Sequence, residues 1–283
     1  MGLAYLNGEF MDVAEAKISP LDRGFLFGDG VYEVVPVYKG QFFRMQEHLV
    51  RLEQSLEAIS LKSNHTLALW QEILSRIVVE NGNGNQAVYL QITRGAPLLR
   101  QHVFAEEQAP ATYFATSWPF KTIPIEEREG GSAITLKDNR WGLCHIKSVN
   151  LLANILAMQQ AHTQGHKEAI LIREEYVVEA TSSNVFMVKD NILITPPKTE
   201  YMLGGITREV ILELAAAHHI ATEIRPIHRS ELATADEIWV SSSTKEAWPI
   251  IELDQQPVGD GKIGPLWRQM IHYYQSAIYG SKH

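Results

Sequence analysis

The sequence predicts a mixed α+β protein of two domains, a small α+β first domain and a larger, strand-rich second domain with helices packed around its strands. Three observations support this prediction. The chain has 283 residues, which is more than one hydrophobic core usually organises. Segments with helical and with strand periodicity follow one another without an internal repeat. Two prolines, a mixed charge cluster and a Gly-Gly pair interrupt them, so we predict a first domain over 1–118, a linker over 119–131 and a second domain over 132–283.

The first domain opens with strand-like pieces and tight turns and then becomes helical. Apolar residues recur at three- and four-residue steps over 47–60, which predicts an amphipathic helix. A second helix is expected over 67–80, and it stops at the Gly/Asn run of 81–85. Because this run follows a helix and precedes a strand, we interpret it as a turn rather than a phosphate loop. Apolar and polar residues alternate over 88–93, which is the period of a strand.

The second domain is expected to contain two helices among strands and hairpins. The first helix covers 150–162, and the second runs from 207 to about 219. The apolar side of the first helix consists of Leu151, Leu152, Ile155, Leu156 and Met158. The expected strands lie over 134–136, 143–146 and 237–240, and two hairpins join 169–172 to 176–179 and 184–188 to 192–195.

Composition and charge exclude several classes of protein. The formal net charge is -8 and the Lys and Arg residues are scattered, which argues against nucleic acid as a partner because that affinity comes largely from phosphate neutralisation. The lone cysteine, Cys144, has no partner for an internal disulfide, which fits a reducing compartment. No segment resembles a signal peptide or approaches the roughly 20 apolar residues of a membrane span. We therefore expect a cytoplasmic protein without a membrane partner.

The sequence lacks the common motifs of metalloenzymes, hydrolases and nucleotide-binding proteins, and its histidines have no ligand spacing, so we predict no metal site. Lys147 follows an apolar stretch and precedes a helix. An amine in that position can be partly desolvated, which favours Schiff-base chemistry. From spacing alone, a solvated surface lysine is the better interpretation.

Three further features are suited to bind a phosphate. Residues 204–207 open a helix whose backbone N–H groups could hold the anion, although an ordinary capped helix has the same sequence pattern. The hydroxyl-rich run 241–244 is suited to the same anion or is simply a loop. Arg51 could face a phosphate or pair with Glu47 four residues earlier. Singly, none of these features decides between binding and structure.

Taken together, these segments resemble the class IV, fold-type IV pyridoxal-phosphate aminotransferases over nearly the whole chain. The resemblance rests on five separated motifs in the order of that family. They are DRGFLFGDGVYE at 22–33, EHLVRL at 47–52, IKSVN at 146–150, EATSSNVF at 179–186, and GITR at 205–208 with the Ser242-Ser243 turn. The resemblance implies the two-domain fold of the family, pyridoxal 5'-phosphate as the cofactor and amino transfer as the reaction.

By this resemblance, Lys147 would form the internal aldimine with the cofactor and would move a proton between the substrate Cα and the cofactor. Glu179 would pair with the protonated pyridine nitrogen, which lets the ring draw electrons from the substrate. Leu203 would pack beside the ring. The residues that would bind the phosphate are Arg51, Ile206, Thr207, Ser242 and Ser243.

Within the family, the chain is most similar to the D-amino-acid transaminases. There, Tyr32, Arg100 and His102 would bind the substrate α-carboxylate, with the Arg and the His supplied by the neighbouring subunit. The resemblance thus implies a homodimer with a shared active site. Its small-molecule substrates would be D-amino acids, such as D-alanine and D-glutamate, and 2-oxo acids. Two alternatives of the same fold stay open, an aminodeoxychorismate lyase that eliminates pyruvate in folate synthesis and a branched-chain L-amino-acid aminotransferase.

Overall fold

A computed structural model describes residues 2–104 and 109–280, which form two compact units. The first unit runs to Thr122 and includes Ile146–Asn150, and the second comprises Ile123–His145 and the chain from Leu151 onward. The chain therefore enters the second unit inside the predicted linker and returns once to the first. Lys147 lies in the returning segment, whereas the predicted domain limits put it in the second domain. Those limits stay a prediction, because the units are defined by contacts alone.

The first unit is built on a six-stranded sheet of order β2-β1-β6-β5-β3-β4, in which every neighbouring pair is antiparallel. Its strands are β1 (Leu3–Leu6), β2 (Glu9–Asp12), β3 (Gly30–Tyr38), β4 (Gln41–Phe42), β5 (Gln86–Thr93) and β6 (Thr112–Pro119). Its helices are α1 (Arg23–Phe27), α2 (Met45–Ala58) and α3 (Leu67–Glu80). The predicted helix over 67–80 is confirmed, and α2 begins and ends two residues before the predicted limits.

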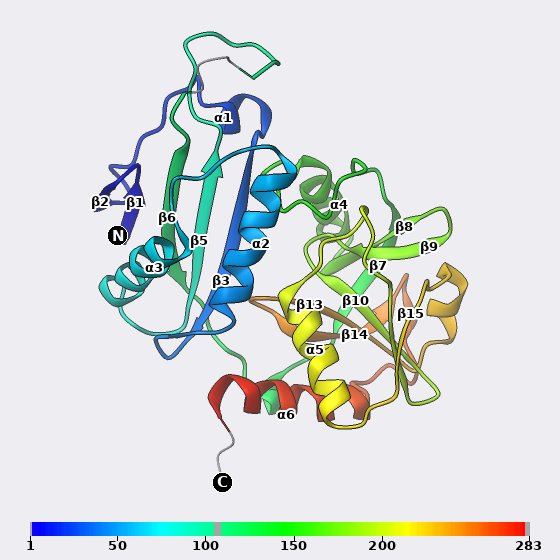
Figure 1. Ribbon diagram of the computed structural model, residues 1–283. Helices are drawn as coiled ribbons and strands as arrows, with labels where there is room; N and C mark the ends of the chain where they lie inside the picture. The colour runs from blue at the N-terminus through cyan, green and yellow to red at the C-terminus, as the bar shows by residue number, and fades with distance from the viewer. Residues whose placement is uncertain (1, 105–108, 281–283) are drawn as a thin grey trace. The chain divides into compact units, whose positions relative to one another are not determined.

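The core of the first unit forms where α2 and α3 cover the sheet (Figure 1). The apolar residues that predict α2 lie in this core, because their three- and four-residue spacing puts them on one face of the helix. Buried members of the core on the two helices include Leu49, Leu52, Leu56, Trp70 and Ile77. The packing holds α2 against β3, the strand that follows the Asp22–Asp29 part of the first motif.

The second unit is built on a nine-stranded sheet of order β12-β11-β10-β13-β14-β7-β8-β9, with β15 paired to β14. β7 is parallel to both of its neighbours, and β11 is parallel to β12. Its strands are β7 (Gly131–Lys137), β8 (Glu168–Arg173), β9 (Tyr176–Ala180), β10 (Asn184–Lys189), β11 (Ile192–Thr195), β12 (Thr222–Ile224), β13 (Glu237–Ser242), β14 (Glu246–Leu253) and β15 (Gln256–Pro257). Its helices are α4 (Leu152–Thr163), α5 (Ile206–Ala217) and α6 (Pro265–Tyr279), with 3-10 turns η1 (Ile125–Glu127) and η2 (Arg229–Thr234).

Both predicted hairpins are confirmed, as β8 with β9 and β10 with β11. Each turns through two residues with positive φ, Glu174-Glu175 in the first and Asp190-Asn191 in the second. Two-residue turns of this kind match the twist of the strands they join. The second pair, Asp-Asn, is a strong turn signal because both residue types tolerate the left-handed region.

The predicted strand over 143–146 is wrong. Leu143 and His145 are exposed while Cys144 and Ile146 are buried, so the alternation of a strand is present. The backbone has no ladder partner, however, and the His145 amide donates to the carbonyl of Glu200 over 3.2 Å. Alternating apolar and polar residues indicate which side chains are buried, but a strand also needs a second strand whose backbone pairs with it.

The apolar side that we predict for the helix over 150–162 does not pack into a core. α4 forms, but Leu152, Ile155 and Leu156 are 60 to 64% exposed. Conversely, α6 was not predicted, although its buried residues Trp267 and Tyr274 lie on one face. Within the described residues, no helix is both long and apolar enough to cross a membrane.

Candidate active site

Lys147 lies on the segment that returns to the first unit, and backbone hydrogen bonds hold this segment along β3. The Tyr32 amide donates to the Lys147 carbonyl over 2.9 Å, and the Val149 amide donates to the Gly30 carbonyl over 3.0 Å. The Lys147 amide donates to Ser55 Oγ of α2 over 3.3 Å. These bonds fix the backbone from which the half-buried Lys147 side chain extends.

The Lys147 amine lies beside the ring of Tyr32, with 4.3 Å between Nζ and the ring centroid. Tyr32 in turn stacks on Tyr89 of β5, and their centroids are 5.6 Å apart. Burial, with a smaller effect of Tyr32, raises the pKa of Tyr89 to about 12, so Tyr89 is a neutral phenol at neutral pH. The structure therefore brings together two of the predicted site residues, the amine and the aromatic side chain.

Arg51, the predicted phosphate ligand on α2, binds Glu33 of β3 with both arms of its guanidinium. Nε donates to Oε1 over 2.7 Å, and Nη2 donates to Oε2 over 2.8 Å. His48 Nδ1 lies 2.8 Å from Glu33 Oε2. Glu47, the alternative partner of Arg51, accepts a hydrogen bond from Arg44 Nη1 over 2.9 Å.

The Glu33 carboxylate is charged although it is fully buried. Burial alone raises its pKa, but Arg51 and His48 outweigh this effect and hold the pKa far below its ordinary value. For His48, burial lowers the pKa more than Glu33 raises it, so the imidazole is neutral at neutral pH. Because Glu33 orients the Arg51 fork, the position of the guanidinium is set before any anion binds.

Arg100 and His102 lie on the loop after β5, and both side chains are exposed. The Arg100 guanidinium lies 4.6 Å from the centroid of the Phe27 ring, and the His102 ring lies 5.3 Å from the same centroid. Within the part of the chain that the structure describes, neither residue forms a hydrogen bond or ring contact with Tyr32 or Lys147. The structure thus brings this pair together at α1 rather than at the lysine.

In the second unit, the donors that hold Glu179 of β9 in place include Arg140, Asn184 and the Leu203 amide. Oε1 accepts from Arg140 Nη1, and Oε2 accepts from the Leu203 amide over 3.2 Å and from Asn184 Nδ2 over 3.4 Å. Arg140 also donates from Nε to Asp138 Oδ1 over 2.9 Å. Burial acts to lower the pKa of Arg140, but Asp138 and Glu179 raise it above its ordinary value. The acid and its charged partner are therefore fixed together in the interior.

Asn184 connects Glu179 to the start of α5. Its Nδ2 also donates to the Leu203 carbonyl over 2.8 Å. A Cβ added to Gly205 would lie 2.0 Å from Asn184 Oδ1, so this close approach requires a glycine. Asn184 is also the register partner of Ser241 on β13, so the run 241–244 begins beside it. At one end of the β10–β13 pair, the structure thus assembles Glu179, Leu203, the first turn of α5 and the serine turn.

The first turn of α5 has the chemistry of a phosphate site. Its N-cap, Gly205, has no side chain to cap the free N–H groups of Ile206 and Thr207. Thr207 is buried, and the buried Ser241 Oγ has no hydrogen-bond partner among the described residues. Uncapped amides, a helix dipole and nearby hydroxyls favour an anion. The half-buried Ser242 and Ser243 lie on the strand end and turn that follow. The donors present therefore fit the phosphate of the predicted cofactor.

Glu168, at the start of β8, joins the turn after Glu179 to the turn after β13. Its buried carboxylate accepts from the Thr181 amide and from the Ser183 hydroxyl, each over 3.2 Å. It also forms an ion pair of 2.8 Å with Lys245. One carboxylate thus binds both the turn that follows the strand of Glu179 and the turn that carries Ser243.

The sequence motifs assign no role to Arg140, Asn184 or Glu168. Arg140 carried a signal, because Asp138-x-Arg140 is a charge pair directly after a strand and seven residues before Lys147. Asn184 stands inside the fourth motif but was not given a function. Glu168 has no local signal, since apart from the adjacent Ala169 amide its partners lie 13 to 77 residues away in the sequence.

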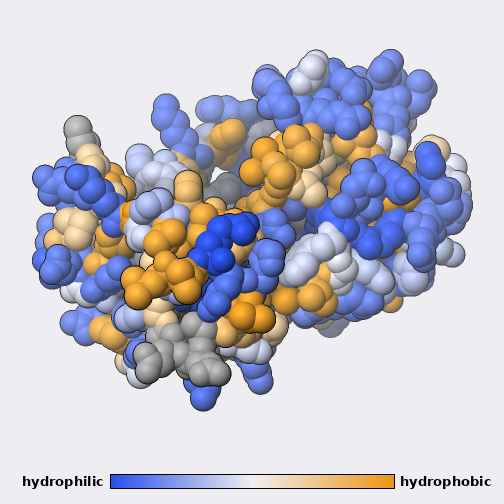
Figure 2. Space-filling model, turned by 90° about the horizontal axis from the view of Figure 1, so that it is seen from above, coloured by the Kyte–Doolittle hydropathy of each residue, from blue (hydrophilic) through white to orange (hydrophobic). Residues whose placement is uncertain are grey.

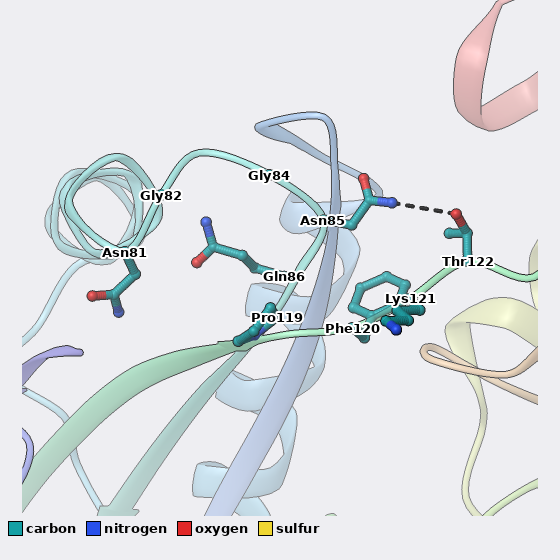
Figure 3. A pocket seen from close by; sticks show the side chains of 9 residues that line it. All are labelled: Asn81, Gly82, Gly84, Asn85, Gln86, Pro119, Phe120, Lys121 and Thr122. Carbon is teal, nitrogen blue, oxygen red and sulfur yellow. Dashed lines mark hydrogen bonds between the residues drawn. The ribbon is translucent and has the colours of Figure 1, made fainter. Parts of the chain in front are cut away.

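Among the described residues of the first unit, the cavities include two that no predicted site residue lines. A cavity of about 480 Å³ opens at the run 81–85 (Figure 3). There, Asn85 Nδ2 donates to Thr122 Oγ1 over 3.4 Å, and the Asn81 side chain bonds to Leu3. These asparagines bind neighbouring segments. Residues 81–85 form turns and bends between α3 and β5, so the prediction of a turn is confirmed. The other cavity, of about 420 Å³, is lined by residues of α2, α3 and the segment between them.

A family model described as Amino-transferase class IV matches residues 30–253. A D-alanine aminotransferase of Listeria monocytogenes serotype 1/2a (strain 10403S) is 41% identical over 276 residues, which cover 96% of this chain and 95% of the relative. A D-alanine aminotransferase of Staphylococcus aureus (strain COL) is 38% identical over 275 residues, which cover 97% of each chain.

Solved structures give the same fold. A branched-chain amino acid aminotransferase from Escherichia coli superposes with a TM-score of 0.91 at 24% identity, over 100% of this chain and 96% of that one, which shows the fold alone. A T.th. branched-chain amino acid aminotransferase with pyridoxamine 5'-phosphate superposes with a TM-score of 0.90 at 26% identity, over 99% of this chain and 95% of that one.

Proposed function

The chain belongs to the class IV aminotransferase family, and on this premise we propose that it catalyses reversible amino transfer between D-amino acids and 2-oxo acids. The observation that carries the proposal is the identity of 38 to 41% to D-alanine aminotransferases over nearly the whole length of both chains. The order of the motifs and the position of Lys147 beside Tyr32 support it. D-Alanine and D-glutamate are the substrates that we propose.

Class IV aminotransferases depend on pyridoxal phosphate, which, when bound, supplies an aldehyde for amines and a ring that withdraws electrons from the substrate Cα. We propose that the phosphate is held by the first turn of α5 with Thr207, by Ser242 and Ser243, and by Arg51. Glu179 pairs with the ring nitrogen, and Leu203 packs beside the ring. Arg140 and the Leu203 amide support the role of Glu179, since they fix the direction of its carboxylate.

The Lys147 amine serves first as the attachment point of the cofactor and then as the base that moves the proton at the substrate Cα. The hydrogen bonds from β3 to its backbone support this role, because a proton transfer requires a fixed geometry between base and carbon. Tyr32, whose ring lies beside Nζ, binds the substrate carboxylate with Arg100 and His102. Arg100 is suited to this task because its planar fork matches a carboxylate.

We also propose that the protein is a homodimer. Apolar side chains gather at several places on the surface of the molecule (Figure 2). On α4, Leu152, Ile155 and Leu156 are more than half exposed. Large exposed apolar side chains close together mark interaction surfaces, because water solvates them poorly. A second copy of the chain is the partner that we assign to α4.

An amino-transfer assay tests the proposed reaction. Purified enzyme with D-alanine and 2-oxoglutarate should form pyruvate and D-glutamate, identified by chiral chromatography. We expect the rate with D-alanine to exceed that with L-alanine or L-leucine by at least about tenfold, or about 1.4 kcal/mol in the barrier. Transfer from the L-amino acids alone would favour a branched-chain aminotransferase. Pyruvate and aminobenzoate from aminodeoxychorismate alone would favour the lyase.

A further inference from the structure

The loop after β5, residues 95–104, forms few hydrogen bonds with the rest of the unit. Its exposed side chains include Arg100 and His102, the pair proposed to bind the substrate carboxylate. Among the residues that the structure describes, the hydrogen bonds that residues 96–104 receive come from one side chain, that of Arg23 in α1. The position of the carboxylate-binding pair therefore depends on a residue outside the loop.

Arg23 reaches the loop with both ends of its guanidinium. Nη1 donates to the carbonyl of Gln101 over 2.5 Å, and Nη2 donates to the carbonyl of His102 over 3.2 Å. Arg23 is buried, so water competes little for these donors. The two carbonyls follow Arg100 directly in the chain, and a fork that binds both restricts rotation of the backbone between them.

The guanidinium is itself anchored to the base of the loop. Arg23 Nε donates to Asp29 Oδ2 over 2.7 Å, and the same oxygen accepts from Arg94 Nε over 2.9 Å. The Arg23 amide donates to the Gly95 carbonyl over 2.9 Å. Asp29 precedes Gly30, the first residue of β3, which also carries Tyr32. One ion-paired cluster thus connects the loop to the strand of the proposed aromatic ligand.

Ring contacts with Phe27 of α1 complete the arrangement. Phe27 contacts both the Arg100 guanidinium and the His102 ring, and the Arg23 guanidinium lies 4.9 Å from the centroid of the same ring. The guanidinium of Arg94 lies 3.7 Å from the centroid of the Phe104 ring, and the guanidinium of Arg23 lies 5.7 Å from it. Cation–π contacts of this kind orient the side chains that they join.

From these contacts we infer that Arg23 is a positioning residue for substrate specificity, which holds the loop so that Arg100 and His102 meet the α-carboxylate of the amino acid. The inference rests on the proposed function. Arg23 does not touch substrate in this role. It acts through the backbone between Arg100 and His102, so its loss should affect substrates that carry a carboxylate and spare those that lack one.

The test compares D-alanine with ethylamine, which is the same amine without the carboxylate. Arg23→Lys keeps the positive charge beside Asp29 but has no planar fork to bind two carbonyls. We expect its single-turnover rate constant for D-alanine at a concentration well below KM, followed by the visible band of the holoenzyme, to fall about tenfold or more. The rate constant for ethylamine should stay within about twofold. In steady state, KM for D-alanine should rise while kcat changes little.

Two control variants make the result decisive. Arg100→Ala should give the same selective loss, and Arg76→Lys, which changes an arginine stacked on Phe10 elsewhere in the unit, should give none. Equal losses for D-alanine and ethylamine, or an unchanged KM for D-alanine, would overturn the positioning role. If Arg23→Lys unfolds, Arg23→Gln takes its place with the same criteria. A wild-type enzyme that does not react with D-alanine would overturn the proposed function instead, which is a separate outcome.

Discussion

Glu33 sets the position of Arg51, the proposed phosphate ligand, through a two-armed ion pair in the interior of the first unit. A charge that loses its partner in such a place is costly. The pKa of Glu33 is lower in the folded protein than the value of about 4.3 in an unfolded chain. The ionised carboxylate therefore contributes stability that is complete above that unfolded value and is lost as the pH falls below it, toward the lowered folded pKa.

We expect Glu33→Gln to lower the melting temperature at pH 7 by roughly 5 to 10 °C, because Arg51 stays buried without its counter-charge. Thermal unfolding followed by circular dichroism measures this. The difference from wild type should shrink between about pH 5 and pH 3, since Glu33 then takes up a proton in the unfolded chain but stays ionised in the folded one, which reduces the stability that the ion pair contributes. Glu47→Gln, which removes a more exposed ion pair with Arg44, should change the melting temperature by less than about 1 °C. A constant difference at all these pH values would contradict a charged Glu33.

At the scale of the element, the first turn of α5 combines two requirements. The helix needs an N-cap without a side chain so that its amides stay open to an anion. The same residue must let Asn184 approach, because Asn184 holds Glu179 and the Leu203 carbonyl. Gly205 satisfies both requirements, whereas its neighbour Gly204 has room for a side chain, since a Cβ added there would lie at ordinary contact distance, 3.6 Å from the Lys198 side chain.

Gly205→Ala should weaken the binding of pyridoxal phosphate about tenfold or more, because the new Cβ displaces the Asn184 side chain. Gly204→Ala is the matched control and should change the affinity by less than about threefold, since its Cβ makes only an ordinary contact with Lys198. Equilibrium dialysis of each variant gives the cofactor dissociation constant directly. Equal affinities for the two variants would mean that the Asn184 contact does not shape the site.

Elements whose signal lies in their own residues were predictable. The helix over 67–80 matches α3 because its apolar period is complete within the segment. The hairpin at Asp190-Asn191 follows from residues that tolerate positive φ. The strand over 143–146 failed because pairing depends on a partner elsewhere in the chain. The motifs identify Glu179 from its own segment. Its partner Arg140 lies 39 residues earlier, so only the structure shows that the two side chains form a pair.

At the scale of the whole molecule, each unit carries its own part of the proposed chemistry. The first unit supplies the Lys147 amine, Tyr32 and Arg51 on and beside β3, although Lys147 lies 96 residues after Arg51 in the sequence. The second unit supplies Glu179 and the first turn of α5 at one end of the β10–β13 pair. Sheets fix residues that are distant in the sequence, which is why motifs scattered over the chain can serve one reaction.

The most direct test of the central claim is the visible spectrum of the purified holoenzyme during a half-reaction without a 2-oxo acid. Excess D-alanine should remove the band of the bound cofactor and release one pyruvate per site, whereas L-alanine should leave the band in place. Lys147→Ala should lack the covalent cofactor that borohydride traps in the wild-type chain. Loss of the band with L-alanine alone, or a trapped cofactor in Lys147→Ala, would contradict D-amino-acid transfer at Lys147.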